Sequence, residues 1–252
     1  DEGTKLAIKA ENLISNKPAD EIDGNWIDVE NEGSLNLSGN LLNVVIGKAT
    51  DKEKGGLVNI NSSISLGEKG EIRNNTVNIN NDGVGLTVNA DKITNSVIYV
   101  NDNSLTLTGG TLNSNVNGGK TNINGDVVLA SSSNIASSVV NVAENKSLTI
   151  AAGNSWNHAI SGKGTTIFGA DFYGNNNAVI ETLLINNGRL TSNSANIKGN
   201  VSNNKKLTLN GNNDVFNNTI TGSGDLTLNG VMTANKTISQ KSITNNGTLN
   251  SS

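Results

Sequence analysis

The chain has 252 residues, among them 48 asparagines and 28 glycines, with one proline, no cysteine and seven aromatic residues. Its formal net charge is −4, but residues 1–30 carry −5, from eight acids and three lysines, which leaves +1 on residues 31–252. The sequence contains no basic stripe and no apolar stretch near the ~18 residues of a membrane helix. We therefore expect neither a nucleic-acid partner nor membrane insertion by this segment.

Residues 1–28 differ in composition from the rest of the chain. They hold the only proline, Pro18, most of the acidic excess, and Trp26. A solenoid needs an atypical end piece, because an open end would expose both an unpaired strand edge and the core. We predict an N-terminal capping segment over 1–28. The alternative is an irregular first rung, where a rung is one turn of the coil.

One phrase recurs over residues 29–252, and its clearest copy runs from Ile220 to Gly230, as Ile-Thr-Gly-Ser-Gly-Asp-Leu-Thr-Leu-Asn-Gly. Each copy is an apolar anchor, a Gly/Asn corner and an alternating apolar-polar-apolar segment, a pattern that predicts a strand. Further copies lie at 29–39, 100–109, 142–150, 160–169 and 201–211, with shorter forms at 185–190 and 243–249. Such repetition predicts units that stack on one another.

The spacing of the copies predicts the type of solenoid. Aligned on the first strand residue, they fall at positions 35, 72, 86, 105, 148, 166, 190, 207, 226 and 249, and several gaps are 17 to 23 residues. A period near 20 with irregular steps excludes hexapeptide repeats and the longer helical repeats. We predict an all-β fold, a right-handed parallel β-helix of roughly eleven rungs. Its core should include Leu107, Ile150, Leu209 and Leu228.

Asparagine suits the corners and the stacking of such a coil. It tolerates the left-handed conformation that tight corners need, and its side chain can bond the backbone there. At one position in successive rungs, asparagine amides can also form hydrogen-bonded ladders. No linker composition interrupts 29–252, and the chain stops in the middle of the phrase after Leu249. We therefore expect one repeat domain over 29–252, as a truncated part of a longer protein.

The acidic residues beyond the N-terminal segment are sparse. Asp91 and Asp102 are 11 residues apart, as are Asp214 and Asp225, which does not match the ~20-residue rung that would stack them. With one histidine, His158, and no cysteine, the sequence predicts no zinc site. We expect no catalytic residues, no metal site and no cofactor, although a Ser-His-Asp arrangement stays open at this point.

Four of the seven aromatic residues lie within 18 residues, at Trp156, Phe168, Phe172 and Tyr173. We take Trp156, His158, Phe172 and Tyr173 as a candidate surface patch that would stack on sugar rings or contact a protein partner. The alternative is that the aromatic rings fill one irregular, wider rung of the core.

The phrase, the Asn/Gly/Ser/Thr richness, the missing cysteine and the irregular period together resemble the passenger domains of bacterial autotransporters, the type V secretion family. The resemblance covers 29–252 and implies a β-helix exposed on the surface of a Gram-negative cell and anchored, in the whole protein, through a C-terminal outer-membrane barrel. The family's passengers act in adhesion, aggregation or toxin delivery, which are virulence functions.

We expect a non-enzymatic surface rod that acts in adhesion or cell–cell aggregation. Its partners would be a receptor on a host or bacterial cell, or a second copy bound through the sides or ends of the solenoid. The alternatives are a surface-layer or filament subunit, a passenger similar to vacuolating toxins, and a glycan-acting β-helix.

Overall fold

The structure is a computed structural model of the chain and describes residues 5–9, 12–14, 26–27, 29, 33–39, 41–47, 55–151, 156, 158–172, 175–176 and 178–251. The chain divides into two compact units, unit 1 with residues 1–127 and 132–138, and unit 2 with residues 128–131 and 139–252. The composition of 29–252 predicted no such division.

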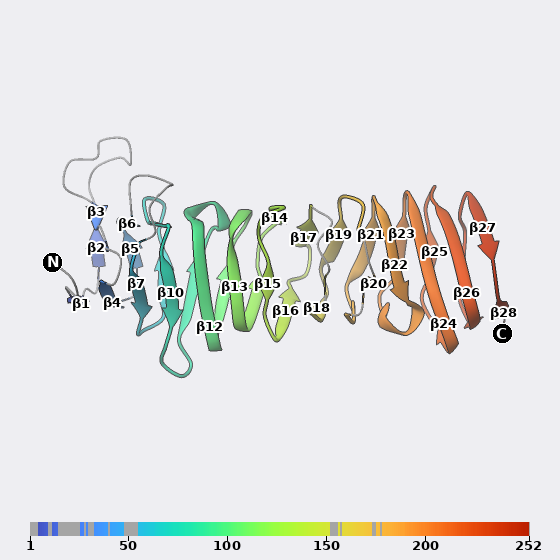
Figure 1. Cartoon of the computed structure of the whole chain (residues 1–252), viewed down its shortest axis with the longest axis horizontal. Helices are drawn as coiled ribbons and strands as arrows, with labels where there is room; N and C mark the ends of the chain where they lie inside the picture. The colour runs from blue at the N-terminus through green and yellow to red at the C-terminus, as the bar shows by residue number, and fades with distance from the viewer. Residues whose placement is uncertain are drawn as a thin grey trace. The chain divides into compact units, whose positions relative to one another are not determined.

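The described part of unit 1 is built of strands of 2 to 15 residues (Figure 1), together with one 3-10 helix. The elements are β1 (Lys5–Lys9), β2 (Asn12–Ile14), β3 (Trp26–Ile27), β4 (Ser34–Ser38), β5 (Leu41–Asn43), β6 (Val45–Gly47), β7 (Leu57–Ile60), β8 (Ile64–Leu66), β9 (Glu71–Arg73), β10 (Thr76–Ile79), β11 (Gly85–Val88), η1 (Ala90–Lys92), β12 (Ile93–Leu107), β13 (Gly110–Ile123) and β15 (Ile135–Ala136). The strand β14 (Val127–Leu129) begins in unit 1 and ends in unit 2.

Unit 2 has the same make-up. Its elements are β16 (Val139–Val142), β17 (Ser147–Ile150), β18 (Ile160–Gly162), β19 (Thr165–Phe168), β20 (Asn175–Asn176), β21 (Leu183–Asn186), β22 (Arg189–Asn193), η2 (Ser194–Asn196), β23 (Val201–Asn203), β24 (Lys206–Phe216), β25 (Ile220–Thr221), β26 (Asp225–Ala234), β27 (Ser242–Asn245) and β28 (Thr248–Ser251). No helix among the described residues is long and apolar enough to span a membrane.

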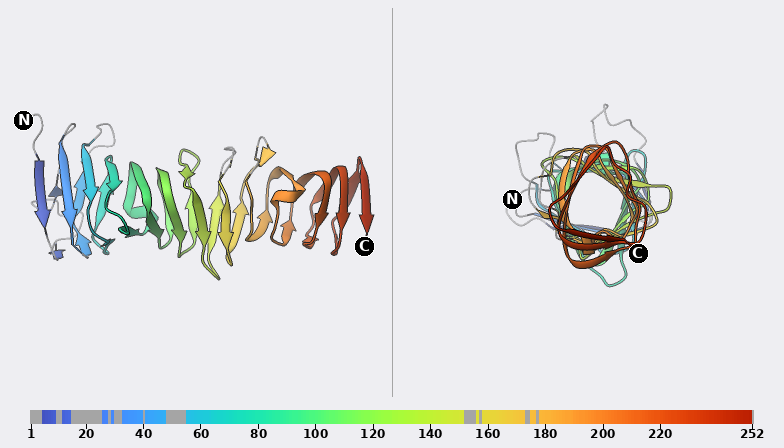
Figure 2. Two further views of the ribbon diagram at one scale, coloured as in Figure 1. Left: turned by 90° about the horizontal axis from the view of Figure 1, so that it is seen from below. Right: turned by 90° about the vertical axis from the view of Figure 1, so that its right-hand side faces the viewer.

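The strands pair in parallel with strands one rung away. In unit 1, β1 pairs with β4 and β4 with β7, while β2 pairs with β5 and β3 with β6, so three strands complete one rung. In unit 2, β22, β24 and β26 form one such ladder, and β17, β19 and β21 form another. The predicted β-solenoid is confirmed, with about 10 turns (Figure 2).

The irregular period is confirmed, but the ladders join only some of the residues that the phrase alignment placed one step apart. Leu35 pairs with Val58, 23 residues further on, whereas Leu105 pairs with Thr121, only 16 residues further on. The aligned steps from 86 to 105, 190 to 207 and 207 to 226 are true neighbours. Leu226, however, pairs with Ile243 rather than with Leu249. Copies of the phrase lie on all three sides of the coil. The phrase therefore identifies strands, but it does not identify the side of the coil to which a strand belongs.

The described parts of residues 1–28 form strands in register with the repeat. In β1, Leu6 pairs with Leu35 and Ile8 with Leu37, and in β3 Trp26 pairs with Val45. The described strands of residues 1–28 therefore continue the ladders of the repeat. Whether the segment also protects the end of the coil stays a prediction.

The core is a set of columns of Leu, Ile and Val that alternate along each strand with outward polar residues. The four predicted core residues, Leu107, Ile150, Leu209 and Leu228, are all buried, with at most 3% of their surface exposed. Complete burial of a Leu or Ile side chain contributes roughly 1.5–3 kcal/mol. These columns are therefore the main source of stability in each unit.

Asparagine and glycine shape the corners as the sequence predicts. Among the described residues, every non-glycine residue with a positive φ is an asparagine: Asn74, Asn95, Asn101, Asn145 and Asn213. In the recurring phrase, Gly222 has a φ of +120°, and a Cβ added there would lie 2.3 Å from the carbonyl oxygen of Asn203 on the neighbouring rung. The corner therefore requires glycine for both its backbone conformation and its close contact.

Candidate functional site

The structure places two of the four predicted patch residues in the core. Trp156 and Phe172 are each 2% exposed, so their predicted surface position is wrong. The described rings form two separate edge-to-face pairs, Trp156 with His158 at 6.0 Å and Phe168 with Phe172 at 5.2 Å between centroids. The alternative interpretation is that aromatic rings fill one wider rung of the core. The burial of Trp156 and Phe172 fits this interpretation.

The other two predicted patch residues have different outcomes. His158 is partly exposed, and its backbone carbonyl accepts a hydrogen bond from the indole Nε1–H of Trp156. It follows that His158 positions the tryptophan, whereas a contact of His158 with a ligand stays a prediction. Tyr173 lies outside the described residues.

The best-defined charged group of unit 2 is an ion pair between Asp171 and Lys205. The Lys205 Nζ lies 3.0 Å from the Asp171 Oδ1, and the backbone N–H of Arg189 donates to the same oxygen at 2.9 Å. The hydrogen bond from Lys205, and then that from Arg189, lower the pKa of Asp171 below its ordinary value of 3.8. Both side chains are partly exposed, so the pair is a surface contact, and it joins residues that lie two rungs apart.

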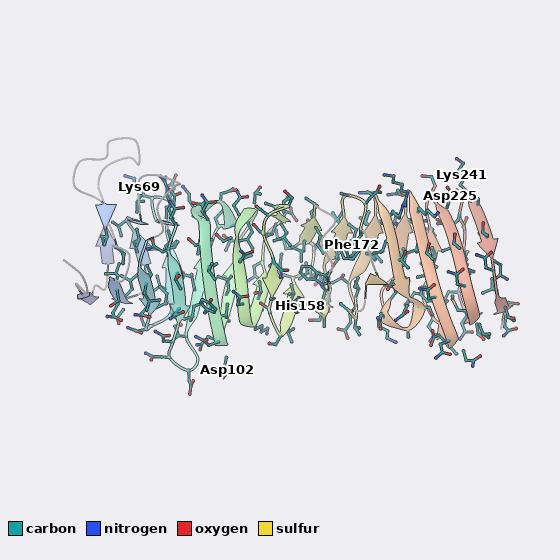
Figure 3. All side chains as sticks on the ribbon, in the orientation of Figure 1. Lys69, Asp102, His158, Phe172, Asp225 and Lys241 are labelled. Carbon is teal, nitrogen blue, oxygen red and sulfur yellow. The ribbon has the colours of Figure 1, made fainter. Side chains whose placement is uncertain are left out.

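The other charged groups in the described part of the chain are dispersed or paired locally. Glu71 and Arg73 form a two-pronged ion pair within β9, and Asp214 accepts a hydrogen bond from the hydroxyl of Ser194 at 2.6 Å. Asp225 and Lys241 belong to successive rungs of unit 2 (Figure 3). The described residues contain no group of three or more His, Cys, Asp or Glu side chains that could hold a metal ion.

One side of unit 1 presents a wide uncharged surface, which we call the neutral face. It is the outward side of β4, β7, β10, the middle of β12 and β13, and β15, joined by parallel pairing. The inward residues of these strands are buried Leu, Ile and Val. The outward residues are Ser34, Asn36, Ser38, Leu57, Asn59, Thr76, Asn78, Val97, Tyr99, Asn115, Asn117 and Ala136, all of them uncharged.

Tyr99 is the most distinctive residue of the neutral face. It is 43% exposed and lies in one ladder between Asn78 of β10 and Asn117 of β13. The same ladder continues from Asn78 to Asn59 and Asn36. Asp102, the next charged residue along the chain, projects from the following corner, where it is exposed (Figure 3). The neutral face is therefore the candidate interaction surface, with Tyr99 near its middle.

Tyr99 is not among the predicted patch residues, although the sequence around it carries a signal for its exposure. In the run Val97-Ile98-Tyr99-Val100, strict alternation places Ile98 and Val100 on the opposite side of the strand from Tyr99. Burial of Ile98 and Val100 then requires the tyrosine to face outward. The density of aromatic residues along the chain points instead to residues 156–173, and such a cluster fits a buried rung as well as a surface patch.

Comparison of the chain with known protein families, with curated proteins and with solved structures found no match.

Proposed function

We propose that this chain is a non-enzymatic β-solenoid that is displayed outside a Gram-negative cell and acts in adhesion or cell–cell aggregation. The observation that carries the proposal is the neutral face, where six parallel strands present amides, hydroxyls and an exposed tyrosine on one side of unit 1. A broad, preformed surface of this kind can bind a partner with little reorganisation of the protein.

The solenoid fold supports this function physically. Each rung is fixed by backbone hydrogen bonds to its neighbours and by the buried columns, so outward side chains can vary while the backbone stays in register. The resemblance to autotransporter passengers adds the extracellular location. A receptor on a host or bacterial cell, or a second copy of the chain, is the proposed partner.

A bead assay tests the proposal with the purified chain. Beads coated with the folded chain are expected to bind epithelial or bacterial cells, or one another, more than beads coated with the heat-unfolded chain. The number of attached beads and the size of bead clusters are the readouts. Equal attachment and equal clustering of the two bead types, across a panel of cell types, would overturn the proposal.

A further inference from the structure

We propose that the neutral face is a recognition site for a neutral glycan, with Tyr99 as the stacking surface for one sugar ring. The inference rests on the proposed adhesive function and specifies the class of ligand. It also assigns particular roles to Tyr99, Asn78 and Asn117.

The position of Tyr99 gives the sugar its apolar contact. The ring is 43% exposed although both of its ladder neighbours lie only ~4.8 Å away, which is the usual spacing of paired strands. The face of an aromatic ring carries partial negative charge and attracts polarised C–H bonds. One face of a pyranose ring presents such C–H bonds. A sugar stacked on Tyr99 would bury apolar surface on both partners.

The side-chain amides of Asn78 and Asn117, on either side of Tyr99, supply polar contacts for the sugar. The side chains of Asn78 and Asn117 make no hydrogen bond within the described part of the chain, whereas Asn59 in the same ladder bonds Asn36 at 2.9 Å. Each free amide offers a carbonyl oxygen as acceptor and an NH₂ group as donor. A sugar hydroxyl also donates and accepts. A ring stacked on Tyr99 would therefore have a matching group on either side.

The absence of charged side chains on the neutral face determines which class of glycan it can bind. The outward side chains of the six strands of the neutral face are uncharged, so the surface around Tyr99 offers no cation to pair with a carboxylate or a sulfate. Lys5 and Lys9 of β1 pair with Ser34 and Ser38 at the edge of this ladder, four strand pairings away from Tyr99. Desolvation of such an anion would remain uncompensated. The neutral face thus fits a neutral hexose-containing glycan better than a sialylated or sulfated one.

The same residues fit a protein partner less well. A stable protein–protein interface buries about 800 Å² on each partner and is enriched in aromatic residues at its centre. The neutral face offers a single exposed aromatic ring among amides and hydroxyls. Such a composition matches a ligand that is rich in hydroxyl groups.

A glycan microarray tests the proposal. Fluorescent beads that carry many copies of the full chain would be applied to arrays of neutral, sialylated and sulfated glycans, because multivalent display compensates for weak single contacts. We expect binding to neutral glycans, with affinity about tenfold lower for Tyr99→Thr and nearly unchanged for Tyr99→Phe. Asn78→Ala and Asn117→Ala should each weaken binding about three- to tenfold.

A matched control separates recognition from folding. Leu183→Thr removes another outward strand residue of similar exposure, 42%, from unit 2, and should leave glycan binding unchanged. Circular dichroism and thermal unfolding of each variant check that the fold is retained. Equal binding by Tyr99→Thr and the wild type would overturn the proposal, as would a preference for acidic glycans.

The outcomes also distinguish this inference from the proposed function. If the chain binds cells but no neutral glycan, adhesion stands and the glycan inference fails. If Tyr99→Thr lowers cell binding while enzymatic removal of cell-surface glycans has no effect, the partner is a protein and the glycan inference fails. If the chain binds neutral glycans but no cells, the glycan inference stands and the adhesive function fails.

Discussion

At the scale of single residues, two neighbouring asparagines in unit 2 show how burial determines what a hydrogen bond contributes. Asn203 is buried, accepts a hydrogen bond from Asn186 at 2.8 Å, and donates to the carbonyl of Asp225. Asn204 is exposed and donates to Asn187, also at 2.8 Å. Water can replace the partner of Asn204 but not the partners of Asn203.

We therefore predict that Asn203→Ala lowers the free energy of unfolding by about 1–3 kcal/mol, since it leaves the buried amide of Asn186 with one partner fewer. The adjacent change Asn204→Ala should alter the free energy of unfolding by no more than about 0.5 kcal/mol. Urea denaturation of the two variants measures the difference. Equal destabilisation would show that burial does not set the contribution of these ladders.

The ion pair of Asp171 predicts a pH dependence. Because the folded-state pKa of Asp171 lies below its ordinary value of 3.8, the pair stabilises the fold above that value. The contribution is lost as the pH falls through the folded-state pKa. We expect an NMR titration of the Asp171 carboxyl to give a pKa below 3.8 in the wild type and a value closer to 3.8 in Lys205→Ala. An unchanged titration midpoint in that variant would contradict this assignment.

Residue-level predictions from the sequence succeed where the side chain's own chemistry is decisive. The left-handed asparagines and the asparagine ladders follow from the amide group itself. The burial of Trp156 and the exposure of Tyr99 depend on which way a strand faces in the coil. Local alternation determines this for Tyr99 but not for Trp156, which lies outside the strands of unit 2.

At the scale of the element, the strand β24 combines a core face and a solvent face. Leu207 is fully buried and pairs with Leu190 and Leu226 on the two adjoining rungs, while Val215 is 56% exposed. In a repeat protein each rung contacts mainly its neighbours. A cavity at Leu207 should therefore act locally on β22 and β26.

We predict that Leu207→Ala costs about 2–5 kcal/mol of stability and increases amide hydrogen exchange in β22 and β26. Val215→Thr, in the same strand, should change stability by about 0.5 kcal/mol or less. Hydrogen exchange followed by mass spectrometry measures both variants. Uniform loss of protection throughout unit 2 would indicate that its rungs unfold as one cooperative block.

The recurring phrase predicts strands well but not which strands pair. Three strands of each rung share one apolar-polar-apolar pattern, because each must bury alternate residues against the same central core. Leu226 and Leu249 therefore look like successive copies, although Leu226 pairs with Ile243 and Leu249 with Met232. Only the backbone pairing distinguishes the three sides.

At the scale of the whole molecule, repetition is what makes the fold predictable. The sequence indicates a parallel β-solenoid of roughly eleven rungs, and the structure has about 10 turns. The acidic composition of residues 1–28 concealed strands whose apolar residues follow the repeat, as Leu6 and Ile8 in β1 show. The division into two compact units has no signal in the composition.

If this protein acts as an adhesive surface solenoid, as we propose, loss of its gene should weaken the adhesion of living cells. Bacteria that carry the intact gene would be compared with an isogenic deletion strain for attachment to host cells and for settling from suspension as aggregates. We predict that the deletion strain attaches or aggregates less and that the restored gene recovers the difference. Equal attachment and equal aggregation by the two strains would contradict the claim.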